Sequence, residues 1–205
     1  MGRSRPEPKD PNSDLTPRSQ PTSRPAEARV KKSKMEFLKI VAFGLVAAVT
    51  YGVIHDQVTA RVCLEYFTIG HPPLIQTASP TLLAFAWGFV ATWWVGLPLG
   101  VIVAMAAQSG ARPKLTATQV RPYILWLLVT VAALASMSGL AVYFLATHGV
   151  IALDKDWSAL LPEGTQIPFL VDLWTHTASY AFGIAGAAII AVFVYRKRIT
   201  LAPPA

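Results

Sequence analysis

The sequence predicts an all-α integral membrane protein, a bundle of four membrane-spanning helices that follows a disordered N-terminal tail. Apolar residue types make up 53% of the 205 residues and charged types only 14%, a low charged fraction for a soluble domain of this size. Four apolar stretches are each long enough to cross a bilayer, which takes about 20 residues. Positive charge gathers at the N-terminus and in alternate connections between these stretches.

Residues 1–34 form the predicted disordered tail. They include nine Lys or Arg, four Asp or Glu and six Pro, with almost no large apolar side chains. Such a segment cannot bury enough surface to offset the entropy of folding. The basic residues at its end are expected to contact anionic headgroups of the lipid bilayer. Aromatic residues are not interleaved with these charges, so we expect no nucleic-acid partner.

The membrane domain is predicted over residues 35–198, and a short C-terminal tail over residues 199–205. Its first span is expected to continue as a helix to residue 67, beyond the hydrocarbon layer. Pro98 removes a backbone donor inside the second span and is expected to kink it. The four predicted spans are 37–57, 80–106, 121–147 and 170–195.

The distribution of Lys and Arg predicts the orientation of the spans. Basic residues precede the first span, lie between the second and third, and follow the fourth. The other two connections are poor in basic residues, since 66–79 has none and 148–169 has only Lys155. Because short cytoplasmic loops are enriched in Lys and Arg, we expect both termini in the cytoplasm.

Ionisable residues gather at the opposite, outer side. At 1.5 Å per residue the first span has crossed the roughly 30 Å hydrocarbon layer near Asp56. In the fourth span Asp172, His176 and Tyr180 recur every four residues and so share one face. Polar groups at this depth need water, a partner or protein around them. The candidate functional cluster is His55, Asp56, Arg61, Glu65, His71, Asp172 and His176.

Three interpretations of this cluster are open. A structural one pairs Arg61 with Glu65 or Asp56 and has Asp172 fix a histidine tautomer, which would hold the helices together. A second is a divalent metal site for zinc, iron or manganese, although no HExxH, ExxH or CxxC spacing supports it. A third is a route for protons or solutes, which the scarcity of ionisable groups at the centres of the spans weakens. The metal ligands would be His55, Asp56, Asp172 and His176.

These interpretations lead to different functions. The leading hypothesis is a small polytopic membrane protein whose cluster is structural or binds a membrane or envelope protein. One alternative is a metal-dependent membrane enzyme that uses the cluster, with Glu65 added to the four ligands. The other is a small transporter or proton-coupled protein. No pattern assigns a catalytic residue, and the sequence does not decide whether the protein is an enzyme.

Three runs of the sequence resemble a group of uncharacterised bacterial four-span membrane proteins. The resemblance covers about residues 36–198 and leaves out the proline-rich tail. It implies the four-span fold and a location in a bacterial inner membrane, and it implies no activity, cofactor or partner. The runs are YGVIHDQVTARVCLEYFTIGHPP (51–73), SPTLLAFAWGFVATWWVGLPLG (79–100) and FLVDLWTHTASY (169–180).

Overall fold

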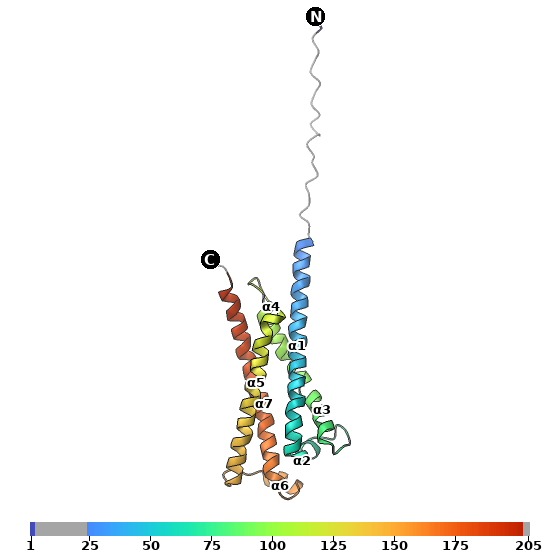
Figure 1. The fold of residues 1–205 in the computed structure, drawn as a ribbon, viewed down its shortest axis with the longest axis vertical. Coiled ribbons are helices and arrows are strands. Elements are labelled where there is room, and N and C mark those ends of the chain that lie inside the picture. The colour runs from blue at the N-terminus through green and yellow to red at the C-terminus, as the bar shows by residue number, and fades with distance from the viewer. Residues whose placement is uncertain (3–23, 203–205) are drawn as a thin grey trace.

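The computed structural model describes residues 1–2 and 24–202, and in the second range it describes side chains from residue 27 onward. Helices are the only regular elements in this part of the chain, so the predicted all-α class is confirmed. Figure 1 shows an elongated bundle whose long helices run alternately down and up. The elements are α1 (Arg24–Val62), α2 (Leu64–Thr68), α3 (Pro80–Val90), α4 (Trp93–Gln108), α5 (Ala117–Thr147), α6 (Lys155–Leu160) and α7 (Gln166–Thr200).

The first helix is longer at its start than the sequence predicted. α1 begins at Arg24, so residues 24–34 are helical and the prediction of disorder was wrong for them. This stretch is rich in Ala, Lys, Arg and Glu, which are good helix formers, and Glu27 in the first turn favours the positive end of the helix dipole. The rest of the predicted tail, residues 3–23, lies outside the described residues.

The end of α1 also differs from the prediction of a continuous helix to residue 67. Cys63 is extended, with φ −147° and ψ 104°, and it separates α1 from the short helix α2. The turn allows Tyr66 and Phe67 to be buried against Leu83 and Phe169 instead of standing above the bundle. Burial of these two aromatic side chains outweighs the continuation of the helix.

The second predicted span is divided into α3 and α4, which meet at a 40° bend. The break lies at Ala91 and Thr92, whereas Pro98, where we expected the kink, lies inside α4. The backbone groups freed by the break have partners, as backbone inside a bundle requires. The Tyr180 hydroxyl donates to the carbonyl of Ala91 at 3.2 Å, and the Thr92 hydroxyl donates to the carbonyl of Gly88.

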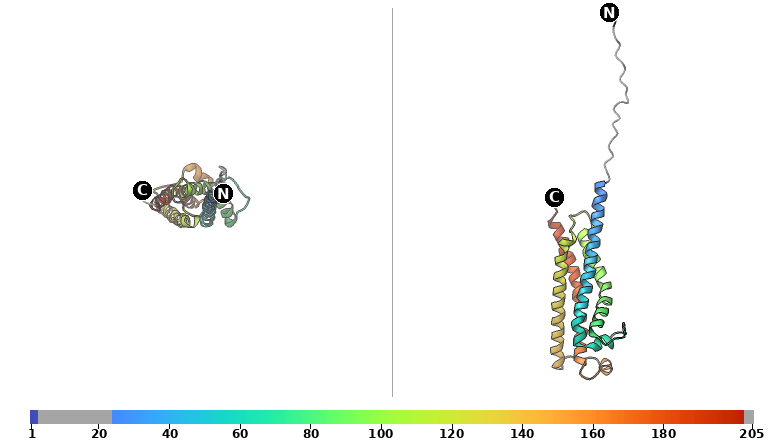
Figure 2. Two further views of the ribbon diagram at one scale, coloured as in Figure 1. Left: turned by 90° about the horizontal axis from the view of Figure 1, so that it is seen from above. Right: turned by 45° about the vertical axis from the view of Figure 1, so that its right-hand side comes forward.

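Close packing holds α3 and α4 against α1 on both sides of the bend. A Cβ atom added at Gly88 would lie 2.5 Å from the Val53 Cα atom, and one added at Gly100 would lie 3.1 Å from the carbonyl oxygen of Val41. At Gly88 only glycine allows such an approach between helix backbones, and at Gly100 a Cβ atom would force the neighbouring backbone to shift by a few tenths of an ångström. In the two views of Figure 2, α1 lies beside α3 and α4, and α5 lies beside α7.

The start of α1 and the end of α7 lie at one end of the bundle, which we call the basic end (Figure 1). Polar side chains at this end are bonded to backbone groups. Arg198, with 1% of its surface exposed, donates to the carbonyls of Ala106, Ser109, Arg112 and Pro113 at 2.5–3.2 Å. The Glu36 carboxylate accepts from the backbone N–H of Ala117, the first residue of α5, at 2.7 Å. These contacts join the helix ends.

Candidate functional site

Three of the predicted metal ligands lie together at the other end of the bundle. His55 and Asp56 belong to α1, and His176 belongs to α7, 120 residues later. One possible ligand atom from each residue can be chosen so that all three lie within 4.8 Å of one another. The imidazole rings of His55 and His176 meet edge to face with their centroids 4.7 Å apart. We call these three residues the His–Asp cluster.

The two nitrogens of His176 have different roles. Nδ1 lies 2.8 Å from the backbone carbonyl oxygen of Asp172, one helical turn earlier. A carbonyl can only accept, so Nδ1 carries a proton and donates it. In the neutral ring Nε2 then has a lone pair, and it lies 3.2 Å from the Asp56 Oδ1 atom. Two electron donors face each other there, unless a proton or a metal ion lies between them.

Aromatic rings enclose the cluster. Tyr66 stacks on His176 with ring centroids 4.5 Å apart, and Tyr51 stacks on His55 at 5.5 Å. Asp56 is buried, with 6% of its side-chain surface exposed, and His176 is nearly so, with 12%. No described residue bonds to the buried Nε2 atom of His55. The cluster is therefore a polar group inside an apolar shell, and it includes a buried ring nitrogen without a hydrogen-bond partner among the described residues.

Asp172, the fourth predicted ligand, lies outside this set. It is fully buried, and neither of its carboxylate oxygens has a hydrogen-bond partner among the described residues. Its backbone carbonyl, and not its carboxylate, holds the tautomer of His176. The predicted role of the Asp172 side chain in fixing a histidine tautomer is therefore wrong. Side chains of a helix lean toward its N-terminus, so the His176 ring reaches the backbone carbonyl of residue 172.

The remaining residues of the predicted cluster have other partners. Arg61 is exposed and donates to Gln57 and to the Thr81 hydroxyl, so its predicted pairing with Glu65 or Asp56 is wrong. The helix break at Cys63 is the reason, because Arg61 and Glu65 no longer share one helix. Glu65 accepts from the Cys63 thiol at 3.5 Å.

His71 lies close to the cluster without joining it. Its Nδ1 atom contacts the carbonyl of Tyr66 at 2.7 Å, and its ring lies between those of Tyr66 and Trp87, at 4.7 and 4.8 Å. Tyr66 thus separates His71 from His176, on which it also stacks. The fourth histidine, His148, is exposed at the end of α5 and contacts only its own helix among the described residues.

The Cys63 thiol and the Tyr66 hydroxyl, at the turn between α1 and α2, resist ionisation. Cys63 is buried, and burial raises the pKa of its thiol to about 12, with Glu65 and Asp172 acting in the same direction. Burial also raises the pKa of the Tyr66 hydroxyl. Both groups are therefore neutral near pH 7, and Cys63 lacks the thiolate that a nucleophile or metal ligand needs.

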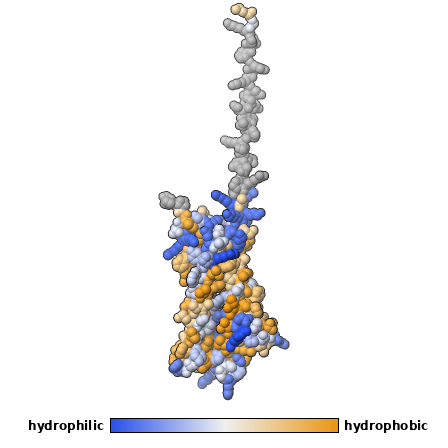
Figure 3. Space-filling model, in the orientation of Figure 1, coloured by the Kyte–Doolittle hydropathy of each residue, from blue (hydrophilic) through white to orange (hydrophobic). Residues whose placement is uncertain are grey.

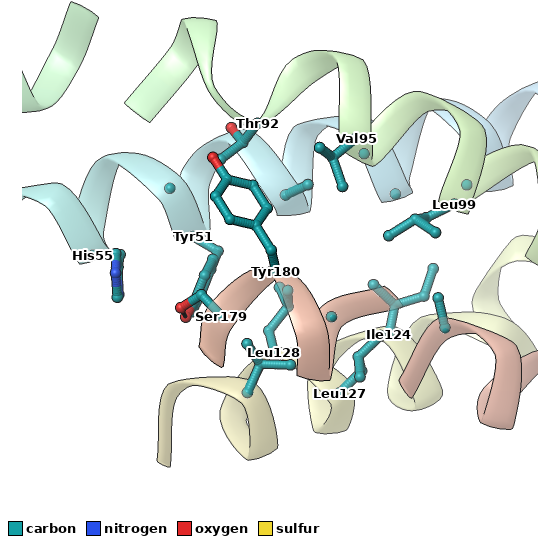
Figure 4. Close-up of a pocket in the computed structure, with 18 of the residues that line it drawn as sticks. Tyr51, His55, Thr92, Val95, Leu99, Ile124, Leu127, Leu128, Ser179 and Tyr180 are labelled. Carbon is teal, nitrogen blue, oxygen red and sulfur yellow. Dashed lines mark hydrogen bonds between the residues drawn. The ribbon is translucent and has the colours of Figure 1, made fainter. Parts of the chain in front are cut away.

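A cavity of about 110 Å³ extends from the His–Asp cluster along the inside of the bundle, between α1, α4, α5 and α7. Figure 4 shows its two ends. His55, Tyr51 and Ser179 lie toward one end, whereas Leu99, Ile124 and Leu127 lie toward the other. The Tyr51 hydroxyl and the Ser179 hydroxyl are 2.7 Å apart. The cluster is thus the polar end of a mainly apolar cavity.

Three Tyr and Ser residues of this wall lie outside the predicted candidate cluster. They are Tyr51, Ser179 and Tyr180. Helical spacing is the signal that could have included two of them, since Tyr51 precedes His55 by four residues and Tyr180 follows His176 by four. Ser179 carries no such signal, because its role depends on the contact between α1 and α7.

Comparison of the chain with models of known protein families, with curated proteins and with solved structures finds no match. The resemblance to a group of four-span bacterial proteins therefore stays a prediction.

Proposed function

We propose that the protein is an integral membrane protein that crosses the bilayer four times. Three helices, α1, α5 and α7, are long and apolar enough to span, and α3 and α4 make a fourth if the bent pair is one span. Large apolar side chains on the outward face of α5 are exposed, among them Trp126, Val129, Met137, Leu140 and Phe144. In water such a continuous apolar face would be unfavourable, whereas lipid tails cover it.

The distribution of polar residues supports one orientation. Figure 3 shows hydrophobic residues over the middle of the visible face and a hydrophilic patch where α1 begins. Lys31, Lys32, Lys34, Arg112, Lys114, Arg196 and Lys197 lie in α1, the α4–α5 connection and α7, all near this basic end. We place the basic end in the cytoplasm of a bacterium and the His–Asp cluster near the outer face of the inner membrane.

Labelling of introduced cysteines tests this orientation. Leu160→Cys, in exposed α6, should react with a membrane-impermeant maleimide on intact spheroplasts, and Ala111→Cys, in the exposed α4–α5 connection, should react only after permeabilisation. Native Cys63 is buried and adds little background. The opposite pattern would place the basic end outside and overturn the topology.

We further propose that the His–Asp cluster binds a divalent transition-metal ion. The proposal depends on one contact. His176 Nε2, which has a lone pair in the neutral ring, lies 3.2 Å from Asp56 Oδ1, which is also an electron donor. Ligand bonds of about 2.0–2.1 Å in a tetrahedral site place ligand atoms roughly 3.3 Å apart, so this pair already has the right spacing. His55 Nε2, which is buried and unbonded among the described residues, supplies the third ligand.

Two imidazoles and one carboxylate suit zinc or iron(II), and they leave coordination positions open. A metal ion in such a site supplies a Lewis acid and lowers the pKa of a bound water. The chain itself would orient the ligands. The carbonyl of Asp172 holds the Nε2 atom of His176 toward the site, and the rings of Tyr51 and Tyr66 exclude bulk water.

Metal analysis of the purified protein tests this proposal. After incubation with Zn²⁺, Fe²⁺ or Mn²⁺ and removal of excess ion, the protein should retain about one ion per chain. His55→Ala and His176→Ala should lose it, since metal ligands dominate affinity. His148→Ala is the matched control, because this histidine is exposed and outside the cluster.

A protein that retains none of the three ions, or His55→Ala and His176→Ala variants that retain them, would refute the metal site. The contact between Asp56 and His176 would then only join α1 to α7. This is a structural role of the cluster, although with other partners than the sequence predicted, and its loss in His176→Ala should lower stability without any effect of chelator.

A further inference from the structure

The cavity beside the His–Asp cluster is strongly asymmetric. One end carries two imidazoles, a carboxylate and the hydroxyls of Tyr51, Ser179 and Tyr180. The rest of the wall consists mainly of glycine and aliphatic residues from four helices. A ligand that fits both parts has an apolar body and a small polar head at one end.

Small residues keep this space open. Four glycines of the wall lie so close to the neighbouring helix that they are needed for packing. They belong to α1 and α4 and are Gly44, Gly52, Gly96 and Gly100. Gly183 of α7 is different, because no described atom lies within 4 Å of the position of an added Cβ. It lines the cavity one turn beyond Ser179. Helix packing therefore does not explain a glycine at this position.

The size of the cavity limits its occupant. A cavity of roughly 150 Å³ with an apolar wall takes one benzene ring and stays dry otherwise. At about 110 Å³, this cavity holds a segment of an alkyl chain. At the polar end a head-group oxygen can bond to a metal ion held by the His–Asp cluster or, in the metal-free protein, to the Nε2 atom of His55.

We propose that the cavity binds a single-chain amphiphile with an oxygen-bearing head, such as a fatty acid or fatty alcohol. The head lies at His55 and His176, and the alkyl chain lies between α4, α5 and α7 beside Leu99, Ile124 and Gly183. A bilayer supplies such molecules from the side, and their heads lie at the depth that we assign to the cluster. The inference rests on the proposed membrane location, and it deepens the proposed function because it names the class of molecule that reaches the metal site.

A fluorescent fatty acid, cis-parinaric acid, is a suitable probe because its emission rises in apolar surroundings. In detergent, the protein should bind about one probe per chain above the signal of protein-free micelles. Dodecanoate and dodecanol should displace it, and acetate should not. Gly183→Leu, which fills the cavity, should weaken binding at least about tenfold, since each displaced methylene corresponds to roughly a fourfold change.

Ala185→Leu is the matched control. It adds a larger side chain to an exposed position of the same helix, two residues away, and should bind like the unaltered protein. Circular dichroism checks that both variants fold. If Gly183→Leu does not fold, the displacement series on the unaltered protein decides, because acetate competing as well as dodecanoate would refute an alkyl-chain site.

Absence of saturable binding by the unaltered protein, or equal binding by a folded Gly183→Leu variant, would also overturn the proposal. The metal content separates the two proposals. Gly183→Leu should retain its metal, so loss of lipid binding with metal retained concerns the cavity alone. A protein that binds the probe but no metal leaves the cavity proposal standing and removes the metal site.

Discussion

The two ends of the bundle differ in whether their buried polar groups have hydrogen-bond partners. At the basic end, the buried side chains of Arg198 and Gln108 each donate to backbone carbonyls of a neighbouring segment. At the other end, His55 Nε2 and both oxygens of Asp172 are buried without a partner among the described residues. A satisfied buried group stabilises the fold, whereas an unsatisfied one costs stability unless something else binds it. The comparison thus distinguishes an end built for structure from an end suited to a ligand.

The largest expected effect is at the basic end. Arg198→Ala should lower the free energy of unfolding by about 3–5 kcal/mol, because several buried carbonyls lose a charged donor and each such bond contributes about 1.5–3 kcal/mol. Denaturation in SDS, followed by circular dichroism, measures the loss. Arg196→Ala removes the same charge from an exposed position and should change stability by less than about 0.5 kcal/mol. Equal losses in both variants would show that net charge, and not backbone bonding, is responsible.

At the opposite end we expect a substitution that stabilises the protein. Asp172→Leu should raise the free energy of unfolding by about 1–2 kcal/mol, because a buried carboxylate without a partner is replaced by an apolar side chain of similar size. Metal content should not change, since Asp172 lies outside the cluster. Asp172→Asn, which keeps a polar group, should show little or no gain. A loss above 1 kcal/mol in Asp172→Leu would mean that the carboxylate has a stabilising partner.

A smaller effect is expected at the bend between α3 and α4. Tyr180→Phe removes the donor to the carbonyl of Ala91 and should cost about 1 kcal/mol in the same denaturation assay. Tyr143 is exposed on α5 and its hydroxyl makes no hydrogen bond to another described residue, so Tyr143→Phe should have no measurable effect. If Tyr180→Phe is also silent, the carbonyl at the bend does not depend on this hydroxyl.

The weakest signal is expected from Cys63. Because the thiol is buried and its pKa is raised to about 12, N-ethylmaleimide should leave it unmodified at pH 7.5 in the folded protein. Mass spectrometry should show no adduct before unfolding in SDS and one adduct afterwards. Gln76→Cys, in an exposed loop, is the positive control. Rapid modification of Cys63 would show that the end of α1 opens readily.

The sequence by itself determined the helical class and the positions of the long apolar helices. It also determined the end of the bundle at which the residues of the His–Asp cluster lie. Rise per residue and apolar length are local properties, so they can be counted along the chain. The same counting placed His55, Asp56 and His176 at one depth before any contact between them was known. Helical spacing likewise put Asp172, His176 and Tyr180 on one face.

Only the tertiary structure decided which of these residues meet. Contacts depend on how each helix is rotated about its axis and on where the chain bends, and both are set by packing against other helices. The breaks at Cys63 and at Ala91–Thr92 show this, since burial of Tyr66 and Phe67 and the close packing of glycines against α1 outweighed continuous helices. For the same reason Arg61 bonds to Thr81 and not to Glu65, whereas His176 contacts Asp56, which is 120 residues away in the sequence.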